Sequence, residues 1–581
     1  MATQRALEMP AIVSNILHQL SEMKYKVKRQ YSPEDPVESV EFRPTLVPSV
    51  LVNRLWADEG TCVLWGNYPH IPALASMAPE RRQYYANKVR KIFTISPPPG
   101  SMSSLEYLAD LQWPLLKSLE MEVDFARHGD QIRSMLHPQL EHLEISGYMS
   151  EGQEYFKQFL LPTIFGLCEN LKSIRFGPGE LDVPEDLLHS SFLQMHLEWT
   201  PSLTNIEIRS GRFVEKDPLF YYLGQRPGLE GLEMDLEPGL DLVPTMQNAT
   251  VPLFQNLKRL TLMSYPEVAH ALIKHLGAVE NLELDICRIP EQPVCDADIA
   301  VIDTTLCLFS HCPRLRRLTL GFAGLANNCP SETNRLALNG ASLISLSSTC
   351  PKLTHLNIFS QPSSIDASGI SSNDFDSFCA NLSHLERLSL KLHPPTASAL
   401  SASALKSLST HCSNLSNLRL KVAFDLSALS IPTTAKPNVL FPFLKELGFA
   451  RPDVGTDFED AVVHAWGAVL ETQFPQLEVL EAWGDWAGEG NESLIYVEPL
   501  DNSLGSVWEF LSGVEQNLWE EEDEEEGWEY EDGRLDDVEE VDEEEWEGKE
   551  DYEWEKEEVR YLQLGERKPE EQKHLDLENK C

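Results

Sequence analysis

Apolar residues along most of the chain repeat one spacing, in which leucines follow a proline at its second, fifth and seventh positions. The clearest copies are residues 313–320 and 351–358, and weaker copies occur from Pro114 to Pro475. A fixed apolar spacing that returns every ~20 to 40 residues is typical of a solenoid, because each strand–helix unit buries its apolar face against its neighbours. The pattern therefore predicts a stack of such units, a scaffold whose surface binds partners.

The first apolar position of the unit recurs about thirteen times, at intervals that scatter around roughly 30 residues. This scatter favours units whose helices and loops differ in length. The predicted positions are Leu116, Leu140, Leu171, Leu203, Leu229, Leu257, Val279, Leu315, Leu353, Leu385, Leu415, Leu444 and Leu477.

Four cysteines, Cys168, Cys312, Cys350 and Cys412, each stand three residues before one of these positions. They belong to separate units, and the chain has no Cys-x-x-Cys pair, which disfavours a metal site or redox chemistry. We expect reduced thiols that are buried as small apolar residues.

With these cysteines, the repeat resembles the leucine-rich repeat family, particularly its cysteine-containing class, in which Cys-Pro or Cys-x closes the helix just before the strand. The resemblance implies an α/β fold, a leucine-rich repeat solenoid (horseshoe), over residues 101–505.

Charged residues alternate with the apolar positions, so they are predicted on the concave face of the sheet. This face is expected to be acidic in its first half, at Glu120, Glu122, Glu144, Glu207, Glu233, Asp235, Glu283 and Asp285, and basic in its second half, at Arg317, Arg387, Lys391, Arg419 and Lys421. Concave solenoid faces often hold extended partners. The predicted substrate-binding residues are Glu233, Asp235, Glu283, Asp285 and the five basic residues; the alternative is that all are ordinary solvated charges.

A different apolar pattern precedes the repeats. Pro10 occupies a plausible first position of a helix, and apolar residues then recur at helical spacing. These residues are Ile12, Val13, Ile16, Leu17 and Leu20, and a second apolar run over residues 46–56 is followed by Leu64-Trp65.

These segments, roughly residues 5–65, resemble an F-box of the fungal type, whose usual form is Leu-Pro-x-Glu-Ile with a helix, then Leu-Val-Cys-Lys-x-Trp, then Leu-Trp. Met9-Pro10, Leu51-Val52 and Trp56 fall in the expected order. The chain departs from the pattern at Ala11-Ile12 and at Asn53-Arg54. Residues 21–45 are an insertion predicted to be a solvated loop.

The resemblance implies that the F-box-like domain, residues 1–70, binds a Skp-type adaptor, which docks the protein on a cullin-RING ubiquitin ligase, while the repeats present a protein substrate. The adaptor-binding residues are then Pro10, Ile12, Ile16, Leu20, Leu51 and Trp56. The alternative is that residues 10–65 form a helical cap on the first repeat. Residues 71–100 are predicted as a helical linker or cap, with a basic helix over residues 81–92 and a degenerate repeat starting at Val89.

The carboxyl-terminal segment, residues 506–581, is strongly acidic. Residues 520–558 carry 25 Asp or Glu against three basic residues, so this net −22 supplies about half of the net charge of −45. Such a segment is expected to be disordered and extended. Interspersed tryptophans and tyrosines leave two roles open, solubility or the binding of a basic partner.

Several classes of function are disfavoured. No apolar stretch is long enough to span a membrane, and the amino terminus lacks a secretory signal. The net charge of −45 argues against direct binding of nucleic acid. Phosphate-binding, metalloprotease and hydrolase motifs are absent, so we expect no catalytic residue, cofactor or metal. Eleven cysteines without an evident pairing fit a reducing compartment, cytoplasmic or nuclear.

The combined prediction is a non-enzymatic substrate-recognition subunit of an SCF-type cullin-RING ubiquitin ligase. Two alternatives remain open. One is a leucine-rich repeat scaffold whose acidic tail binds histones or other basic partners. The other is an activator of a small GTPase, similar to the Ran GTPase-activating family, although that family has more regular units.

Overall fold

The structure is a computed structural model. It describes residues 7–22, 25–29, 36–40, 46–95, 105–146, 156–177, 189–208, 214–236, 239–288, 296–325, 335–361, 363–424, 426, 439–450, 466–467, 469–470, 472–485 and 492–497. The chain divides into two compact units, Met1–Val514 and Glu515–Cys581, and the residues described here belong to the first. The predictions for the acidic segment 506–581 lie outside the described residues.

Three helices lie near the amino terminus: α2 (Pro10–Glu22), α3 (Leu46–Val50) and α4 (Arg54–Gly66). The helix predicted to begin at Pro10 is thus confirmed. Asn53 caps α4 by accepting a hydrogen bond from the Trp56 backbone N–H, at 3.0 Å. Gly60 allows α3 to approach, since a Cβ at this position would lie 2.6 Å from Cγ2 of Val50.

The insertion at residues 21–45 is not loop throughout. It contains two antiparallel strands, β1 (Tyr25–Arg29) and β2 (Pro36–Val40), which pair from Tyr25 and Val40 to Arg29 and Pro36. The physical basis is visible in the sequence, because Tyr25-Lys-Val-Lys alternates apolar and polar residues as a strand does. The loop prediction rested on the proline and lysine content and overlooked this alternation.

The repeats build one sheet of 15 strands, in the order β19 to β3 as neighbours along the chain, with β12 and β14 outside it. All neighbouring pairs are parallel except β18 and β19, which are antiparallel. The strands are β3 (Lys91–Ile95), β4 (Ser118–Glu122), β5 (His142–Ser146), β6 (Ser173–Phe176), β7 (Asn205–Ile208), β8 (Gly231–Asp235), β9 (Arg259–Ser264), β10 (Asn281–Cys287), β11 (Arg317–Ala323), β13 (His355–Gln361), β15 (Arg387–Leu390), β16 (Asn417–Leu420), β17 (Glu446–Ala450), β18 (Val479–Asp485) and β19 (Glu492–Val497).

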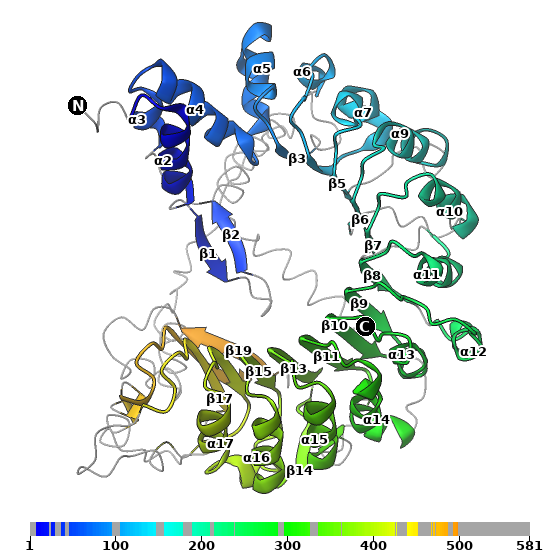
Figure 1. Cartoon of the computed structure of the whole chain (residues 1–581), viewed down its shortest axis with the longest axis vertical. Coiled ribbons are helices and arrows are strands. Elements are labelled where there is room, and N and C mark those ends of the chain that lie inside the picture. Colours follow the sequence, from blue (N-terminus) through cyan, green and yellow to red (C-terminus); the bar gives the residue numbers. More distant parts are fainter. Residues whose placement is uncertain are drawn as a thin grey trace, which may run out of the picture. The chain divides into compact units, whose positions relative to one another are not determined.

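Helices connect the strands and lie along one face of the sheet (Figure 1). The α-helices are α5 (Pro79–Ala86), α6 (Glu106–Ala109), α7 (Phe125–Ile132), α9 (Leu161–Leu167), α10 (Ser190–Glu198), α11 (Lys216–Gln225), α12 (Leu242–Gln247), α13 (Pro266–Ile273), α14 (Val301–Leu308), α15 (Gly340–Thr349), α16 (Ser372–Asn381) and α17 (Ala404–His411). Shorter turns are η1 (Ile71–Ser76), η2 (Arg133–Met135), η3 (Phe156–Leu160), η4 (Asp296–Ala300), η5 (Phe309–His311) and η6 (Ser398–Leu400), and β12 (Ala337–Asn339) pairs with β14 (Asp366–Gly369) in a small parallel sheet.

The predicted apolar positions form the core between sheet and helices. The first positions of the units from Leu116 to Leu444 are at most 2% exposed, and Leu477 is partly buried against the same core. Strand β3 joins the sheet at its amino-terminal end, with Val89 and Ile92 fully buried. The degenerate repeat expected at Val89 is therefore present, and the sheet begins inside residues 71–100. The basic helix ends at Ala86 rather than at residue 92, because the residues after it are needed for this strand.

The cysteines at the helix ends hold successive units together. Cys312, Cys350 and Cys412 are at most 1% exposed. Each thiol donates to a backbone carbonyl of the preceding unit: Cys312 Sγ to Ile273 O at 3.7 Å, Cys350 Sγ to Cys312 O at 3.5 Å and Cys412 Sγ to Leu382 O at 3.6 Å. Burial raises the pKa of Cys168 and of Cys312 to about 12. The prediction that these cysteines are buried, reduced thiols is confirmed.

Candidate functional site

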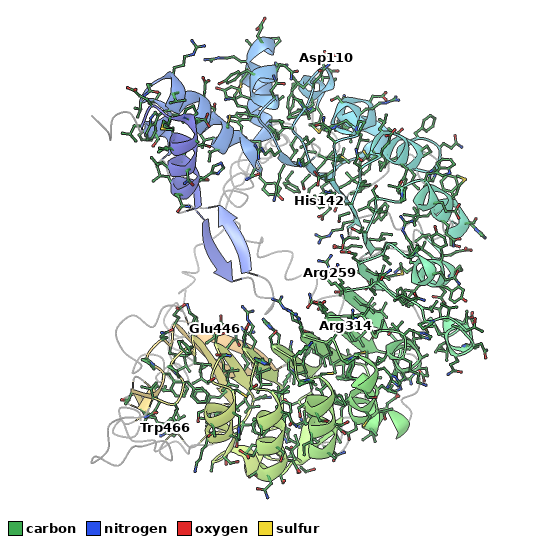
Figure 2. All side chains as sticks on the ribbon, viewed as in Figure 1. Asp110, His142, Arg259, Arg314, Glu446 and Trp466 are labelled. Carbon is green, nitrogen blue, oxygen red and sulfur yellow. The ribbon has the colours of Figure 1, made fainter. Side chains whose placement is uncertain are left out.

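The side chains that alternate with the buried positions form the second face of the sheet, which we call the polar face. Strand pairing places these residues in rows across the sheet. One row runs through Arg259, Asn281, Arg317, His355 and Arg387. Figure 2 shows His142, Arg259 and Glu446 on the side of the strands that faces away from the helices. The neighbours in this row are therefore 22 to 38 positions apart in the sequence.

An ion-pair network crosses the acidic half of the polar face. Arg175 contacts Glu144 Oε2 through Nη1 at 3.1 Å and also pairs with Glu207 through Nε. Arg259 Nη2 contacts Glu207 Oε1 at 3.1 Å. The side chain of Glu207 is only 8% exposed, so these arginines neutralise a carboxylate that has little access to water. Glu144 and Glu207 thus form ion pairs between strands of the sheet.

Arg175 and Arg259 were not among the predicted residues of this face. A signal was present, because Arg175 lies between the buried Ile174 and Phe176 and therefore points to the same face as Glu144. Which carboxylate it reaches depends on the register between strands. The acidic half of the face therefore contains two cations that the predicted charge pattern lacked.

Four predicted carboxylates flank the strand β9. Glu233 and Asp235 lie on β8, and Glu283 and Asp285 lie on β10. The Thr261 hydroxyl donates to Glu283 Oε2 at 3.4 Å. Asp285 leans over β11 at Gly321, where a Cβ would lie 2.2 Å from Asp285 Oδ1. We call these four residues the acidic group.

Two exposed arginines and a histidine lie side by side on β11, β13 and β15. Arg317 is paired in register with His355, and His355 with Arg387. Adjacent strands are ~4.8 Å apart, so the two arginine Cα atoms are separated by ~10 Å. The pKa of His355 is lowered to about 4, first by its partial burial and then by the charges of Arg317 and Arg387. At neutral pH the imidazole is therefore uncharged; we call the three residues the basic row.

The other predicted basic residues are not at the surface. Lys391, Arg419 and Lys421 are 4%, 7% and 3% exposed. The Lys421 ammonium donates to the Ser364 hydroxyl at 2.6 Å, and Arg419 Nη2 is 3.3 Å from Glu446 Oε2. Of the five predicted basic contacts, Arg317 and Arg387 are exposed. The three buried cations add to the positive potential of this half but offer little surface to a partner.

The amino-terminal helices carry the second candidate surface. Val13, Leu17 and Leu46 form a small hydrophobic cluster of their own, against which Leu20 and Trp56 pack. The same helices and the residues next to them leave several apolar side chains exposed: Leu7 (39%), Met9 (53%), Ile12 (36%), Leu51 (79%) and Val52 (61%). Among the predicted adaptor-binding residues, Pro10, Ile12 and Leu51 are exposed, whereas Ile16, Leu20 and Trp56 are half-buried.

Polar and aromatic contacts join these helices to the first repeat. Tyr84 donates to Asp58 Oδ1 at 2.8 Å, and Lys88 donates to the Thr61 hydroxyl at 2.6 Å. The rings of Trp65 and Tyr85 stack with centroids 4.5 Å apart. The basic segment after residue 80 thus does connect the helices to the repeats, as the sequence predicted.

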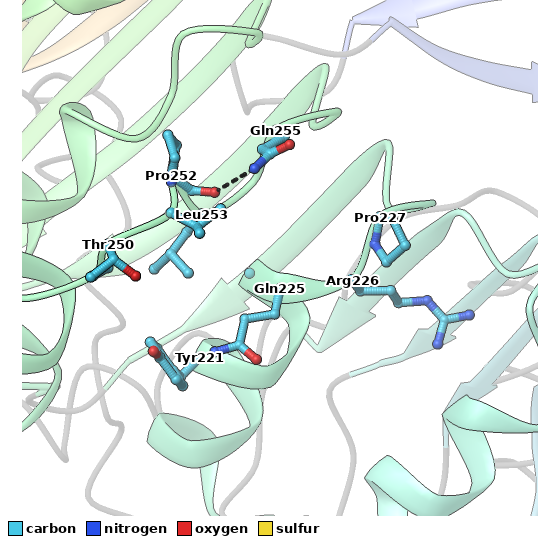
Figure 3. A pocket seen from close by; sticks show the side chains of 11 residues that line it. Tyr221, Gln225, Arg226, Pro227, Thr250, Pro252, Leu253 and Gln255 are labelled. Carbon is cyan, nitrogen blue, oxygen red and sulfur yellow. Dashed lines mark hydrogen bonds between the residues drawn. The ribbon is translucent and has the colours of Figure 1, made fainter.

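A pocket of about 290 Å³ lies between α11 and the turn that precedes β9 (Figure 3). Its lining includes Tyr221, Gln225, Arg226 and Val251, and no carboxylate or imidazole. Arg226 uses its guanidinium to bind the carbonyls of Leu197 and Thr200, at 2.7 and 2.6 Å. Arg226 thus stabilises the turns between units rather than facing a ligand.

Within the residues that the structure describes, no cluster of three or more His, Cys, Asp or Glu is arranged to hold a metal ion. A helix with the length and apolar character needed to cross a membrane is likewise not found among them.

No protein-family model matches the sequence, and no curated protein matches it either. The fold is similar to that of Rad7 in the crystal structure of the Rad7–Elc1 complex in yeast, with 16% identity and a TM-score of 0.36 over 74% of this chain and 89% of that chain. It is also similar to LegL7, a leucine-rich repeat-containing protein from Legionella pneumophila, with 12% identity and a TM-score of 0.27 over 73% of this chain and 98% of that chain.

A third similar structure is TLR13 in its complex with ssRNA13, with 16% identity and a TM-score of 0.27 over 65% of this chain; the match spans 56% of the TLR13 chain. Identities and TM-scores of this size say nothing about partners or activity. The described part of the chain is an α/β leucine-rich repeat solenoid, built on one long and almost wholly parallel sheet with helices at its amino-terminal end.

Proposed function

We propose that the protein is a substrate receptor of an SCF-type cullin-RING ubiquitin ligase, in which the amino-terminal helices bind a Skp-type adaptor and the repeats bind a protein substrate. The observation that carries this proposal is the set of exposed apolar residues on the amino-terminal helices and in the turns next to them. Leu51 and Val52 are 79% and 61% exposed. Clustered apolar residues that stay in contact with water mark sites where another protein binds.

The alternative of a simple cap accounts less well for these helices. Ile71, Leu74 and Ala86, from η1 and α5, belong to the core of the repeats and already cover its first strand. Val13, Leu17 and Leu46 form a separate cluster. Helices α2 and α3 are therefore not needed to close the solenoid, which leaves their exposed residues available for a partner.

The predicted adaptor-binding residues fall into two groups. Pro10, Ile12 and Leu51 are exposed and are proposed to contact the adaptor directly. Leu20 and Trp56 pack on the small cluster, so they support the shape of this surface. Ile16 is half-buried and belongs to neither group.

The joint between helices and repeats also supports the proposal. A receptor must hold its substrate at a fixed place relative to the ligase, and the Tyr84–Asp58 and Lys88–Thr61 hydrogen bonds restrict movement at this joint. Tyr68, at the end of the helical segment, donates to Glu120 Oε1 of β4 at 2.6 Å. Substrate bound to the sheet would thus be presented from a defined position.

The test is binding of the full-length chain to purified Skp-type adaptor, measured by titration calorimetry. We expect Ile12→Asp/Leu51→Asp to weaken binding at least ~30-fold, because each change places a charge in a desolvated apolar contact. Val251→Asp/Val439→Asp is the matched control, since these valines are 59% and 40% exposed but lie in the repeats. Failure of the folded wild-type chain to bind the adaptor would refute the proposal.

Two other functions remain predictions from the sequence. A histone-binding or other basic-partner-binding tail concerns residues outside those described. A small-GTPase activator would be detected as faster GTP hydrolysis by a purified GTPase.

A further inference from the structure

The polar face is divided into two regions of opposite charge by the boundary between β10 and β11. On β11, β13, β15 and β16 the positions of this face hold no carboxylate, as read from the described residues of these strands. On β8 and β10 the face holds the acidic group, with four carboxylates. The change of sign occurs between neighbouring strands, so it is abrupt on the scale of a bound peptide.

The two regions lie at a distance that a short peptide can bridge. The acidic group is centred on β9 and the basic row on β13, three strand spacings further on. At ~4.8 Å per spacing, the centres are ~14 Å apart across the strands, and the acidic group also lies two to four residues further along the strands than the basic row, so the full separation is ~17 Å. An extended chain advances ~3.3 Å per residue, so about five residues connect the two centres.

At physiological ionic strength, the acidic group and the basic row attract the charges of a partner independently of each other. The Debye length is ~8 Å at 0.15 M ionic strength, so a charged group over one region is largely screened from the other region. Arg317 and Arg387 project as exposed guanidiniums, each able to hold a carboxylate through two hydrogen bonds. The net charge of −45 repels acidic molecules elsewhere on the protein, which confines favourable contacts with acidic groups to this region.

We propose that the polar face binds a protein segment of mixed charge, in which basic residues contact the acidic group and acidic residues, about five positions away, contact Arg317 and Arg387. A nucleic acid or an anionic membrane has no cations to place on β8 and β10, so a polypeptide is the partner that fits. This inference does not depend on the adaptor, because the proposed contacts lie on the repeats alone.

The experiment uses the full-length chain and fluorescein-labelled peptides, with binding followed by anisotropy at 100 mM NaCl. The mixed-charge probe has a block of lysines and a block of glutamates whose centres are about five residues apart. One comparison peptide has the same composition with lysine and glutamate alternating, and another contains only the glutamate block. We expect the mixed-charge probe to bind at least ~10-fold more tightly than either, because only it satisfies both regions at once.

Two variants separate the contributions of the two regions. Arg317→Glu/Arg387→Glu is expected to weaken binding of the mixed-charge probe at least ~10-fold. Arg314→Glu/Lys352→Glu is the matched control: it makes the same change in net charge at exposed turn residues just before β11 and β13, and we expect less than a ~2-fold effect. Glu283→Gln/Asp285→Asn is expected to weaken the mixed-charge probe while leaving the glutamate peptide unchanged or more tightly bound.

Three results would overturn the proposal. The glutamate peptide could bind as tightly as the mixed-charge probe, which would make the site purely anion-binding. The acidic-group variant could leave the mixed-charge probe unaffected. Finally, the Arg314/Lys352 control could weaken binding as much as the Arg317/Arg387 variant, which would show that only net charge matters. The acidic segment 520–558 is present in all these proteins, so its effect is held constant.

Discussion

His355 illustrates how one residue on the polar face is set by its neighbours across the sheet. Its ring lies between Arg317 and Arg387, and its Nδ1 is 2.9 Å from the Thr354 hydroxyl. Partial burial and the two guanidiniums lower its pKa to about 4, below the ~6.5 of a free histidine. The folded protein therefore holds this histidine neutral at a pH where the unfolded chain already binds a proton.

The consequence is an acid sensitivity with a defined sign. Because the folded-state pKa is the lower one, the unfolded state binds more protons between pH ~6.5 and ~4, and the free energy of unfolding falls as the pH falls through this window. We expect His355→Gln to lose less stability than the wild type between pH 7 and 5 in urea titrations. Equal losses in the two proteins would contradict this prediction.

Arg175 is the residue for which we expect the largest electrostatic effect on stability. Replacing it with Met leaves Glu207, whose side chain is 8% exposed, with one arginine of the network, Arg259, in place of two. We expect the free energy of unfolding to fall by about 2–4 kcal/mol, because the largely buried carboxylate of Glu207 loses one of its two cations. Lys117→Met is the control: its partner Glu141 also contacts Lys172, and Lys117 is itself 62% exposed, so the loss should stay below ~1 kcal/mol. Urea denaturation measures both.

At this scale the sequence allowed the face of each residue to be predicted, but not its partner. Alternation with buried leucines placed Glu207 and Arg317 on the polar face correctly. The burial of Lys391, Arg419 and Lys421 was not predictable, because it depends on segments brought together by folding, such as Ser364 against Lys421. For the same reason the Arg175–Glu207 pair required the register of the strands.

The cysteines at the ends of the repeat helices behave as structural elements, and this can be tested directly. We expect iodoacetamide at pH 8 to modify Cys62 and Cys307, which are exposed, and to leave Cys168, Cys312, Cys350 and Cys412 unmodified in the folded protein. Burial excludes the reagent, and a thiol with a pKa of about 12, as for Cys312, is almost wholly protonated at that pH. Mass spectrometry of digested samples gives the sites, and denatured protein provides the control.

Elements with a strong apolar repeat were predictable, and elements without one were not. The first positions from Leu116 to Leu477 each precede a strand of the sheet, and the Val89 motif correctly indicated β3. The strands β1 and β2 were missed because these two short segments contain lysine, glutamate and proline, which are common in loops. The reversed strand β19 was also missed, since it does not carry the repeat motif.

The molecule has two hydrophobic clusters in its described part, and they should respond separately to mutation. Val13 lies in the small cluster of the amino-terminal helices, whereas Leu284 lies in the core of the repeats. We expect Val13→Asp to speed hydrogen exchange in residues 10–22 and 54–66 and to leave residues 259–420 unchanged, because the two clusters share few contacts. Leu284→Ala should have the opposite pattern. Faster exchange throughout the chain in Val13→Asp would show that the clusters unfold together.

The ion-pair network restricts which repeat units could be gained or lost during evolution. Cys350 and Cys412 make equivalent contacts with the preceding unit, so the cysteine contacts by themselves would form again if a unit were duplicated or lost. In this half, however, the buried Lys421 also depends on Ser364 of an earlier unit. Between β5 and β9, by contrast, Glu144, Arg175, Glu207 and Arg259 each depend on a residue from another unit. Removing one unit there would leave an unmatched charge, so we expect relatives that differ in repeat number to keep the units from β5 to β9 together.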